Sequence, residues 1–459
     1  MSFADGLPGD YDVRLIRSSV NERAAPQRAL VAACAGNLVE WYDFAIFGAF
    51  ATIIASTYFP SEDTTASLLA TFAVFATAFL FRPLGAVLFG RRGDRLVRRR
   101  VLAFVIILMS VATTGIALLP GYASIGPVAP VLLVLLRAAQ GLSVGGEASG
   151  ASAFVVEYAP AGRRGWYGAW LWATIALGLG VGVAAAAILT RLLPRSALET
   201  WGWRLAFLAA LPLGLTGLYL RLRLDETPPF RAVQHAQALS RRPVTRTLRT
   251  YSSRVMIGFG LVAAASLTFN TFFIFLPSHL MSALNVPLSR ALGAALLGLA
   301  LVTAASPALG RLSDRIGRKP LLAAGMFGLL VVTVPAYLLI RRAGPVSLPF
   351  GYLLVGSAMS CLVLPSFLSE LFPTPVRSTG LAVTYGLASA LFGGTAPFLA
   401  TLLVQRTGNP LVPAYYATAV TLAAVAGVLL AKETAFQPLD AEDVRAVRLS
   451  EPDTAVERR

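Results

Sequence analysis

Two acidic residues, Glu40 and Asp43, lie three positions apart inside an apolar stretch. This spacing places both on one face of a helix. An ionisable group inside a membrane-spanning helix costs at least about 2.5 kcal/mol unless it faces a cavity or a partner. Because two neighbouring carboxylates in a low-dielectric site do not both ionise easily, at least one is expected to bind a proton near neutral pH. Proton coupling is the predicted chemistry, and permanent pairing with an arginine from another helix is the structural alternative.

A second candidate is a polar stripe formed by Arg137, Gln140, Val144 and Glu147. Their helical spacing puts them on one narrow face, which is expected to line a central cavity. Arginine stays charged when buried, so Arg137 either attracts a substrate carboxylate or holds a neighbouring carboxylate ionised. The predicted proton-coupling residues are Glu40, Asp43, Arg137 and Glu147.

Substrate contacts are expected from a partly overlapping set. The set consists of Arg82, Arg137, Gln140, Tyr42 and Trp170. Arg82 precedes Pro83 at membrane depth, although its side chain also has the length to reach the membrane interface. Trp170 belongs to an aromatic group near a predicted interface, where tryptophan is common for reasons of lipid contact alone.

Charged segments at the ends of apolar stretches form an internal repeat. The sequence GRRGDR at 90–95 matches GRLSDR at 310–315, and EYAP at 157–160 matches ELFP at 370–373. Two motifs repeating at nearly equal offsets indicate parallel halves, a known plan of transporters. Their charges are predicted to form gating networks that favour one access state, unless they only fix topology. The predicted gating residues are Asp94, Arg95, Glu157, Arg164, Asp314, Arg315, Glu370 and Arg377.

The composition indicates which elements must position these residues. Hydrophobic residues make up 56% of the 459, charged residues only 14%, and the mean hydropathy is +0.68. Stretches of bilayer-spanning length, about 20 residues, recur along the chain. They lie near 29–57, 65–90, 101–120, 128–157, 166–193, 203–222, 255–282, 288–310, 320–341, 348–370, 378–404 and 412–431. We therefore expect an all-α polytopic membrane protein with twelve transmembrane helices in two six-helix pseudo-repeats.

The expected organisation follows from these spans. It is an N-terminal segment 1–28, a bundle 29–222, a linker 223–254, a second bundle 255–431 and a tail 432–459. Basic residues concentrate in alternate loops, which predicts that those loops and both termini are cytoplasmic. The same loops account for the net charge of +16, so nucleic acid is not an expected partner.

Nothing in the pattern predicts an enzyme, a cofactor or a metal site. The two cysteines, Cys34 and Cys361, both lie in apolar stretches. Disulfide frameworks and metal sites need clustered ligands. The titratable groups within the spans form no nucleophile and base set.

The chain resembles the major facilitator superfamily over nearly its whole length, and within it the metabolite:proton symporter family. Four segments carry the resemblance: GNLVEWYDF at 36–44, the stretch 82–99 that begins RPLG, RAAQGLSVGGE at 137–147, and residues 370–397, which end in FGGTAP. The resemblance implies a bacterial cytoplasmic membrane protein that imports carboxylates such as citrate, oxoglutarate or shikimate, or zwitterions such as proline and betaines, with protons. Departures from the family at Arg91, Arg92, Val97 and Gly386 leave the substrate open.

Three functions are consistent with this pattern: a proton-driven importer of a small organic acid or zwitterion, an exporter or antiporter on the same fold, and a non-transporting sensor. The importer is the preferred interpretation, with the small molecule, protons and the lipid bilayer as partners. The carboxylate pair favours proton coupling but does not determine the direction of net flux.

Overall fold

The computed structural model describes residues 25–85, 88, 98–160, 162–222 and 243–437. Every regular element in these ranges is a helix. Helices satisfy all their backbone hydrogen bonds internally, which is what an apolar chain needs where no water can replace them.

The N-terminal half is built from long helices joined by short connections. Its elements are α2 (Ala25–Ala49), α3 (Ala51–Tyr58), α4 (Thr64–Leu80), α6 (Arg98–Leu118), α7 (Tyr122–Ile125), α8 (Val128–Tyr158), α9 (Arg164–Leu192), α10 (Arg195–Ala197), the π-helical η1 (Leu198–Gly202) and α11 (Trp203–Leu222). Asp63 starts α4 by accepting a hydrogen bond of 2.8 Å from the Thr65 amide, a standard N-cap.

The C-terminal half repeats this plan but contains more interruptions. Its elements are α13 (Pro243–Thr250), α14 (Ser252–Asn270), η2 (Thr271–Phe275), α15 (Leu276–Leu284), α16 (Leu288–Ile316), α17 (Arg318–Arg341), α18 (Ser347–Ser360), α19 (Leu364–Leu371), α20 (Thr374–Leu381), η3 (Ala382–Gly386), η4 (Ser389–Gly394), α21 (Ala396–Thr407) and α22 (Val412–Leu430). Three of them, η2, η3 and η4, are π-helical turns inside longer spans, a feature often found at functional sites.

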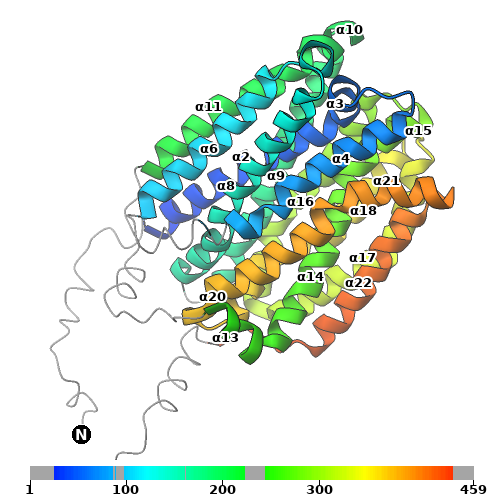
Figure 1. Ribbon diagram of the computed structural model, residues 1–459. Coiled ribbons are helices and arrows are strands. Elements are labelled where there is room, and N and C mark those ends of the chain that lie inside the picture. The colour runs from blue at the N-terminus through cyan, green and yellow to red at the C-terminus, as the bar shows by residue number, and fades with distance from the viewer. Residues whose placement is uncertain (1–24, 86–87, 89–97, 161, 223–242, 438–459) are drawn as a thin grey trace, which may run out of the picture.

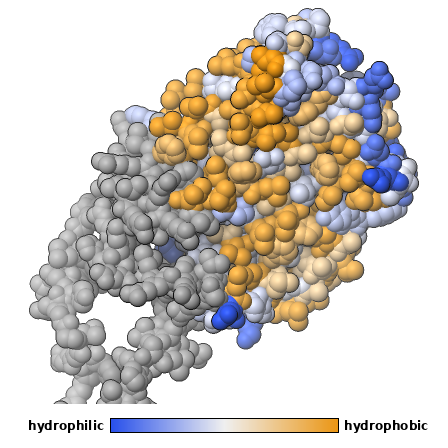
Figure 2. All heavy atoms as spheres, viewed as in Figure 1, coloured by the Kyte–Doolittle hydropathy of each residue, from blue (hydrophilic) through white to orange (hydrophobic). Residues whose placement is uncertain are grey.

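The helices suit a lipid environment. In the described ranges nine helices are long and apolar enough to cross a bilayer, and the bent pair of α2 and α3 makes a tenth span. Helices α6 and α11 pack against each other and complete six spans in the first half. Figure 2 shows apolar residues covering the visible flank, with a polar surface at the end away from the undescribed segments. The expected all-α membrane fold with twelve spans is confirmed.

The first span differs from its prediction, because it is broken rather than continuous. Helices α2 and α3 meet at an angle of 67°, and no proline lies at the bend. Next to the bend, the Ser278 hydroxyl of α15 donates a 2.9 Å hydrogen bond to the Gly48 carbonyl. A side chain that engages a helix carbonyl is one known cause of a kink. Ser278 belongs to the other half, so the bend is also a contact between halves.

The two halves lie side by side, as Figure 1 shows, and α9 against α16 is their most extensive contact. These two helices meet where both lack side chains: a Cβ on Gly310 would lie 2.6 Å from the Gly165 carbonyl oxygen. Only glycine permits this approach of one backbone to the other.

The predicted boundaries between domains remain predictions. Residues 223–242 of the expected linker lie outside the described ranges, and its last part contains α13 and the start of α14. Of the expected tail, residues 432–437 are described, and they pack against the start of α17. The segment 1–24 lies outside the described residues.

Candidate functional site

A cavity lies between the two halves. It is lined by Asn37, Glu40 and Trp41 of α2, Ser152 of α8, Leu171, Trp172 and Ile175 of α9, Leu364, Pro365 and Leu368 of α19, Leu381 of α20 and Tyr385 of η3. Its empty volume is about 580 Å³, including the part that opens to solvent.

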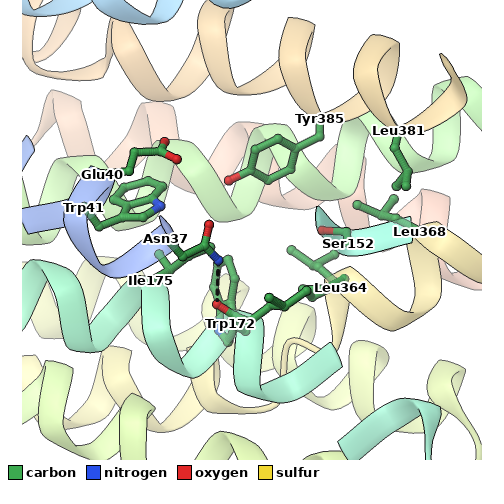
Figure 3. Close-up of a pocket in the computed structure, with 12 residues that line it drawn as sticks. Asn37, Glu40, Trp41, Ser152, Trp172, Ile175, Leu364, Leu368, Leu381 and Tyr385 are labelled. Carbon is green, nitrogen blue, oxygen red and sulfur yellow. Dashed lines mark hydrogen bonds between the residues drawn. The ribbon is translucent and has the colours of Figure 1, made fainter. Parts of the chain in front are cut away.

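The cavity combines one acidic group with several aromatic rings. Figure 3 shows the Glu40 carboxylate and the Tyr385 hydroxyl pointing toward each other from opposite halves. Trp172 donates a 3.1 Å hydrogen bond from its indole nitrogen to the Met359 carbonyl, which fixes its ring across the interface. Trp41 packs edge-on against Phe269, with ring centroids 5.6 Å apart. These contacts hold the aromatic lining in place.

Glu40 is paired with Arg82. A nitrogen of the Arg82 guanidinium lies 2.8 Å from a carboxylate oxygen of Glu40, and Arg82 exposes only 3% of its side chain. The guanidinium also lies over the Phe79 ring, 4.0 Å from its centroid. Arg82 itself does not line the cavity, so Glu40 is the part of the pair that faces it.

Asp43 forms a separate and fully buried cluster. It receives an Arg137 contact of 2.5 Å, a Gln140 hydrogen bond of 2.9 Å and a Thr113 hydrogen bond of 3.0 Å. Neither charged side chain exposes more than 1%. The Arg137 guanidinium also lies 3.8 Å from the centroid of the Phe47 ring. Three hydrogen-bond donors thus converge on the Asp43 carboxylate.

Glu40 and Asp43 therefore have separate surroundings, each pairs with an arginine as in the structural alternative, and their proton-coupling role stays a prediction. Each carboxylate has its own arginine, because helix α8 and the segment directly after α4 each supply one. The stripe on α8 is likewise only partly as expected: Arg137 and Gln140 belong to the Asp43 cluster and do not line the cavity. Glu147 lies on α8, but its side chain is outside the described part of the structure.

Two predicted substrate residues lie elsewhere. Tyr42 is buried and donates a 2.8 Å hydrogen bond to the Ala206 carbonyl of α11, away from the cavity. Trp170 packs against Trp166, with centroids 6.1 Å apart, in a separate apolar cluster. The cavity contains Trp172 instead, which lies two residues further along the same helix.

Sequence reasoning missed most of the cavity lining. Asn37 and Trp41 lie in the motif at 36–44 and Tyr385 in the stretch 370–397, but none of them was selected, and neither was Trp172. One signal was available: Asn37, Glu40 and Trp41 have the spacing of one helix face. The Asn37 amide donates a 3.3 Å hydrogen bond to the Leu171 carbonyl, which joins α2 to α9 beside the cavity.

The halves are joined by polar contacts at the end where α9 begins, which is predicted to be cytoplasmic. Asp314 of α16 accepts hydrogen bonds from the Gly165 and Trp166 amides of α9, at 2.7 and 3.0 Å. It thereby satisfies free amides of a helix N-terminus, where a negative charge is favourable. A second link is the ion pair of Arg377 with Glu157. These contacts join the two halves at this end.

Arg318 is the centre of the charge network in the C-terminal half, although it was not among the predicted gating residues. Its guanidinium lies 2.9 Å from Asp314 and 3.0 Å from Glu370. Arg315 is exposed and forms no ion pair with another described residue. Arg318, rather than Arg315, forms the ion pair with Asp314 because it lies at the start of α17, about one helical turn after Asp314.

The remaining gating predictions have mixed outcomes. Asp94 and Arg95 lie outside the described residues. Arg164 donates a 3.0 Å hydrogen bond to the Gln437 carbonyl, and its own carbonyl accepts one of 2.9 Å from Ser366. Arg164 therefore connects the start of α9 to the end of the described chain and to α19.

Glu433 reinforces this end of the molecule. Its carboxylate accepts hydrogen bonds of 2.8 and 3.0 Å from the Arg318 and Lys319 amides at the start of α17. Burial alone would raise the pKa of Glu433, but the backbone amide donors outweigh it and the pKa is lowered. Thr434 adds a 2.8 Å hydrogen bond to Glu370.

No group of three or more His, Cys, Asp or Glu side chains in the described ranges has the geometry to hold a metal ion. The N-terminal half contains two carboxylate–arginine pairs, and an aromatic cavity and a group of polar contacts lie between the two halves. Fold and site together define a polytopic helical membrane transporter.

Known proteins that are similar to this chain are also membrane transporters. The model of the Major Facilitator Superfamily matches residues 33–384. The glycine betaine/proline/ectoine/pipecolic acid transporter OusA of Dickeya dadantii is 37% identical over 93% of this chain and 87% of its own length. The proline/betaine transporter of Salmonella typhimurium is 37% identical over 90% and 85%. The ectoine/proline transporter ProP of Corynebacterium glutamicum is 34% identical over 88% and 83%.

The fold is also that of solved transporters. The proton:xylose symporter XylE bound to 6-bromo-6-deoxy-D-glucose superimposes with a TM-score of 0.73 at 19% identity, covering 92% of this chain and 99% of that one. The chain belongs to the Major Facilitator Superfamily, in the branch that contains these proline and betaine transporters, and this confirms the expected family. It is an integral membrane protein and a secondary transporter.

Proposed function

We propose that this protein is a proton-coupled symporter that accumulates a small zwitterionic metabolite of the proline and betaine class. The observation that carries the proposal is the placement of Glu40 and Asp43 on α2. Glu40 faces the cavity between the halves, while Asp43 is buried away from it, and each is held by its own arginine. Cargo and proton sites thus share one helix, so occupation of one affects the position of the other.

The coupled proton is assigned to Asp43. Protonation of this carboxylate removes the charge that binds Arg137, so α2 is held less firmly against α8. Coupling then requires that the protonated and loaded protein changes its access state more readily than either partly loaded form. Glu40 remains the predicted partner of this step at the cavity surface, and Glu147 stays a prediction.

Release of cargo on the other side requires the contacts at the start of α9 to break. Asp314 and the pair of Arg377 with Glu157 join the halves there, while Arg318 and Glu370 support Asp314. Such contacts favour one access state over the other. We therefore keep the predicted gating role for Asp314, Glu157, Glu370 and Arg377 and extend it to Arg318.

The cargo is inferred from the charge of the cavity and the names of the relatives. The described lining has one acidic group, Glu40, which is paired with Arg82, so the site is close to neutral overall. A neutral site suits a zwitterion better than a dicarboxylate or tricarboxylate. OusA and the Salmonella protein are named as transporters of betaine and proline. Neither name favours the exporter alternative.

We place the protein in the bacterial cytoplasmic membrane with both termini cytoplasmic, and with halves at 29–222 and 255–431.

The test of the proposed function is uptake into proteoliposomes of glycine betaine, proline, ectoine and citrate, with and without an inward proton gradient. Gradient-stimulated accumulation of at least one zwitterion is expected. Proton-driven loss of these compounds from preloaded vesicles, or accumulation of citrate alone, would contradict the proposal.

A further inference from the structure

Arg82 is buried beside the cavity with unused hydrogen-bonding capacity. Its Nε and Nη1 atoms are buried and have no hydrogen-bond partner among the described residues. A guanidinium carries five N–H donors, and here the Phe79 and Phe44 rings lie 4.0 and 5.0 Å from it. Its only ion-pair partner in the described ranges is Glu40, at 2.8 Å. The donors of Arg82 therefore match an acceptor that arrives from the cavity.

Glu40 stands between this arginine and the cavity. The carboxylate lines the cavity and exposes 12% of its side chain, whereas Arg82 exposes 3% and does not line it. A ligand carboxylate can reach Arg82 only by taking the place of Glu40, and it offers the same chemistry to the guanidinium. The displaced Glu40 then remains in the cavity as a negative charge that has lost its arginine.

The rest of the cavity suits a positive group. Trp41, Trp172 and Tyr385 line the same space as Glu40. Faces of aromatic rings attract cations, and quaternary ammonium groups in particular are recognised by such cages. Trp172 is fixed by its hydrogen bond to Met359, and Trp41 by its contact with Phe269. The aromatic groups are thus already in position before a ligand binds.

We propose that Glu40 acts as an internal substitute for the substrate carboxylate: the zwitterion's carboxylate replaces it on Arg82, and its ammonium group binds Glu40, Trp41, Trp172 and Tyr385. The assignment rests on the proposed function and specifies its cargo site. A carboxylate without a cation takes Arg82 from Glu40 and brings no positive group in exchange. A cation without a carboxylate leaves the pair of Glu40 and Arg82 closed. The site therefore selects for both charges in one molecule.

The test compares ligands of one shape that differ in charge. Glycine betaine has both charges, tert-butylacetate has the same shape without the cation, and choline has the cation without the carboxylate. Binding is measured by calorimetry on the full chain in nanodiscs, without a proton gradient. Each incomplete ligand is expected to bind about 10- to 100-fold more weakly than glycine betaine, the effect of one lost charge-assisted contact. Equal affinity for tert-butylacetate and glycine betaine in the unmodified protein overturns the assignment.

Two variants test which residues produce the preference for glycine betaine. Glu40→Gln is expected to reduce the preference for glycine betaine over tert-butylacetate to within about threefold. The side-chain amide is neutral, so its displacement from Arg82 leaves no negative charge in the cavity. Trp172→Leu is expected to weaken glycine betaine about 2- to 30-fold, the range of a cation–π contact, and tert-butylacetate less. Trp170→Leu, in the neighbouring cluster outside the cavity, is the matched control and should leave both affinities unchanged. An unchanged ligand preference in Glu40→Gln contradicts the exchange.

These measurements separate the two proposals. If glycine betaine binds with the expected preferences but no proton-driven uptake occurs, the cargo site stands and the symport proposal fails. If uptake is proton-driven but the affinities of Glu40→Gln and Trp172→Leu match those of the unmodified protein, symport stands and the exchange is wrong.

Discussion

Arg137 on α8 binds Asp43 on α2 at 2.5 Å in a site from which solvent is excluded. Three donors converge on this one carboxylate, and the Phe47 ring covers the guanidinium. A buried ion pair contributes little net stability compared with a well-packed apolar alternative, but removal of one partner leaves a buried charge. The pair thus links the charge state of Asp43 to the contact between two helices.

Replacement Asp43→Asn is expected to abolish gradient-driven accumulation while leaving some exchange of labelled for unlabelled cargo. The amide cannot carry the coupled proton, whereas the cavity residues are unchanged. The measurement compares uptake under an inward proton gradient with counterflow at equal pH. Gradient-driven uptake at the level of the unmodified protein would remove Asp43 from the coupling step.

The stability of the same pair provides a control for folding. Either Asp43→Asn or Arg137→Gln should lower the free energy of unfolding by about 3–5 kcal/mol, because one buried group loses its counter-charge or acceptor. The double variant should lose less than the sum, since its members interact directly. Thermal denaturation in detergent measures this. Strictly additive losses would mean that Asp43 and Arg137 are not energetically coupled.

The closure at the start of α9 is tested by Asp314→Ala. Loss of a helix cap typically changes stability by about 0.5–2 kcal/mol, so the population open at this end should rise about 2- to 30-fold. A cysteine at Leu364, which lines the cavity, reports this opening by its rate of labelling with an impermeant maleimide. The experiment uses a background in which Cys34 and Cys361 are replaced by alanine.

The matched control for this experiment is Glu199→Ala. Glu199 pairs with the exposed Arg195 at the far end of α9, at 2.7 Å. Its removal should leave the labelling rate unchanged, because exposed pairs contribute little. Equal rates in Asp314→Ala and Glu199→Ala would contradict a gating role for Asp314.

Because α9 and α16 approach each other closely, adding a single methyl group at their contact is expected to destabilise the fold. In Gly310→Ala the new Cβ would lie 2.4 Å from the Ala169 Cβ and 2.6 Å from the Gly165 carbonyl oxygen. Overpacking of this kind costs about 1–3 kcal/mol. Gly293→Ala on the same helix meets nothing within 4 Å and should leave the melting temperature unchanged or raise it slightly. Equal melting temperatures for the two variants would contradict the tight contact.

The contacts of Glu433 with the start of α17 are expected to make the stability of the fold depend on pH. Burial opposes its ionised form, but the backbone amides outweigh burial and lower its pKa. A carboxylate with a lowered folded-state pKa stabilises the fold above its unfolded pKa of about 4.3, and this contribution is lost as the pH falls through the folded-state pKa. The difference in melting temperature between the unmodified protein and Glu433→Gln should be constant above pH ~5. It should then shrink on acidification, and a difference that grows would contradict the contact.

The sequence was most informative at charged residues that lie within apolar stretches. Glu40, Asp43, Arg82 and Arg137 were recognisable because buried charges in spanning helices are rare and need partners. Their pairing was not predictable, since it depends on how α8 and the segment after α4 are turned toward α2. Aromatic residues gave no such signal, because lipid contact and helix packing also favour them.

The contacts between distant segments were beyond sequence reasoning for a similar reason. Arg318 and Glu433 both lie near helix ends, where charged residues are common. Their importance comes from the meeting of α16, α17 and the residues after α22. The 67° bend between α2 and α3 has no proline, and Ser278 from the opposite half donates a hydrogen bond beside it. Such features appear only once both halves are assembled.

Proton movement driven by cargo alone tests the central claim most directly. Proteoliposomes that enclose a pH-sensitive dye are prepared with equal pH inside and outside, and glycine betaine is added externally. Symport predicts that the lumen acidifies on addition of glycine betaine, that a protonophore abolishes the change, and that Asp43→Asn shows none. Uptake of glycine betaine with no change in lumen pH would contradict proton-coupled symport.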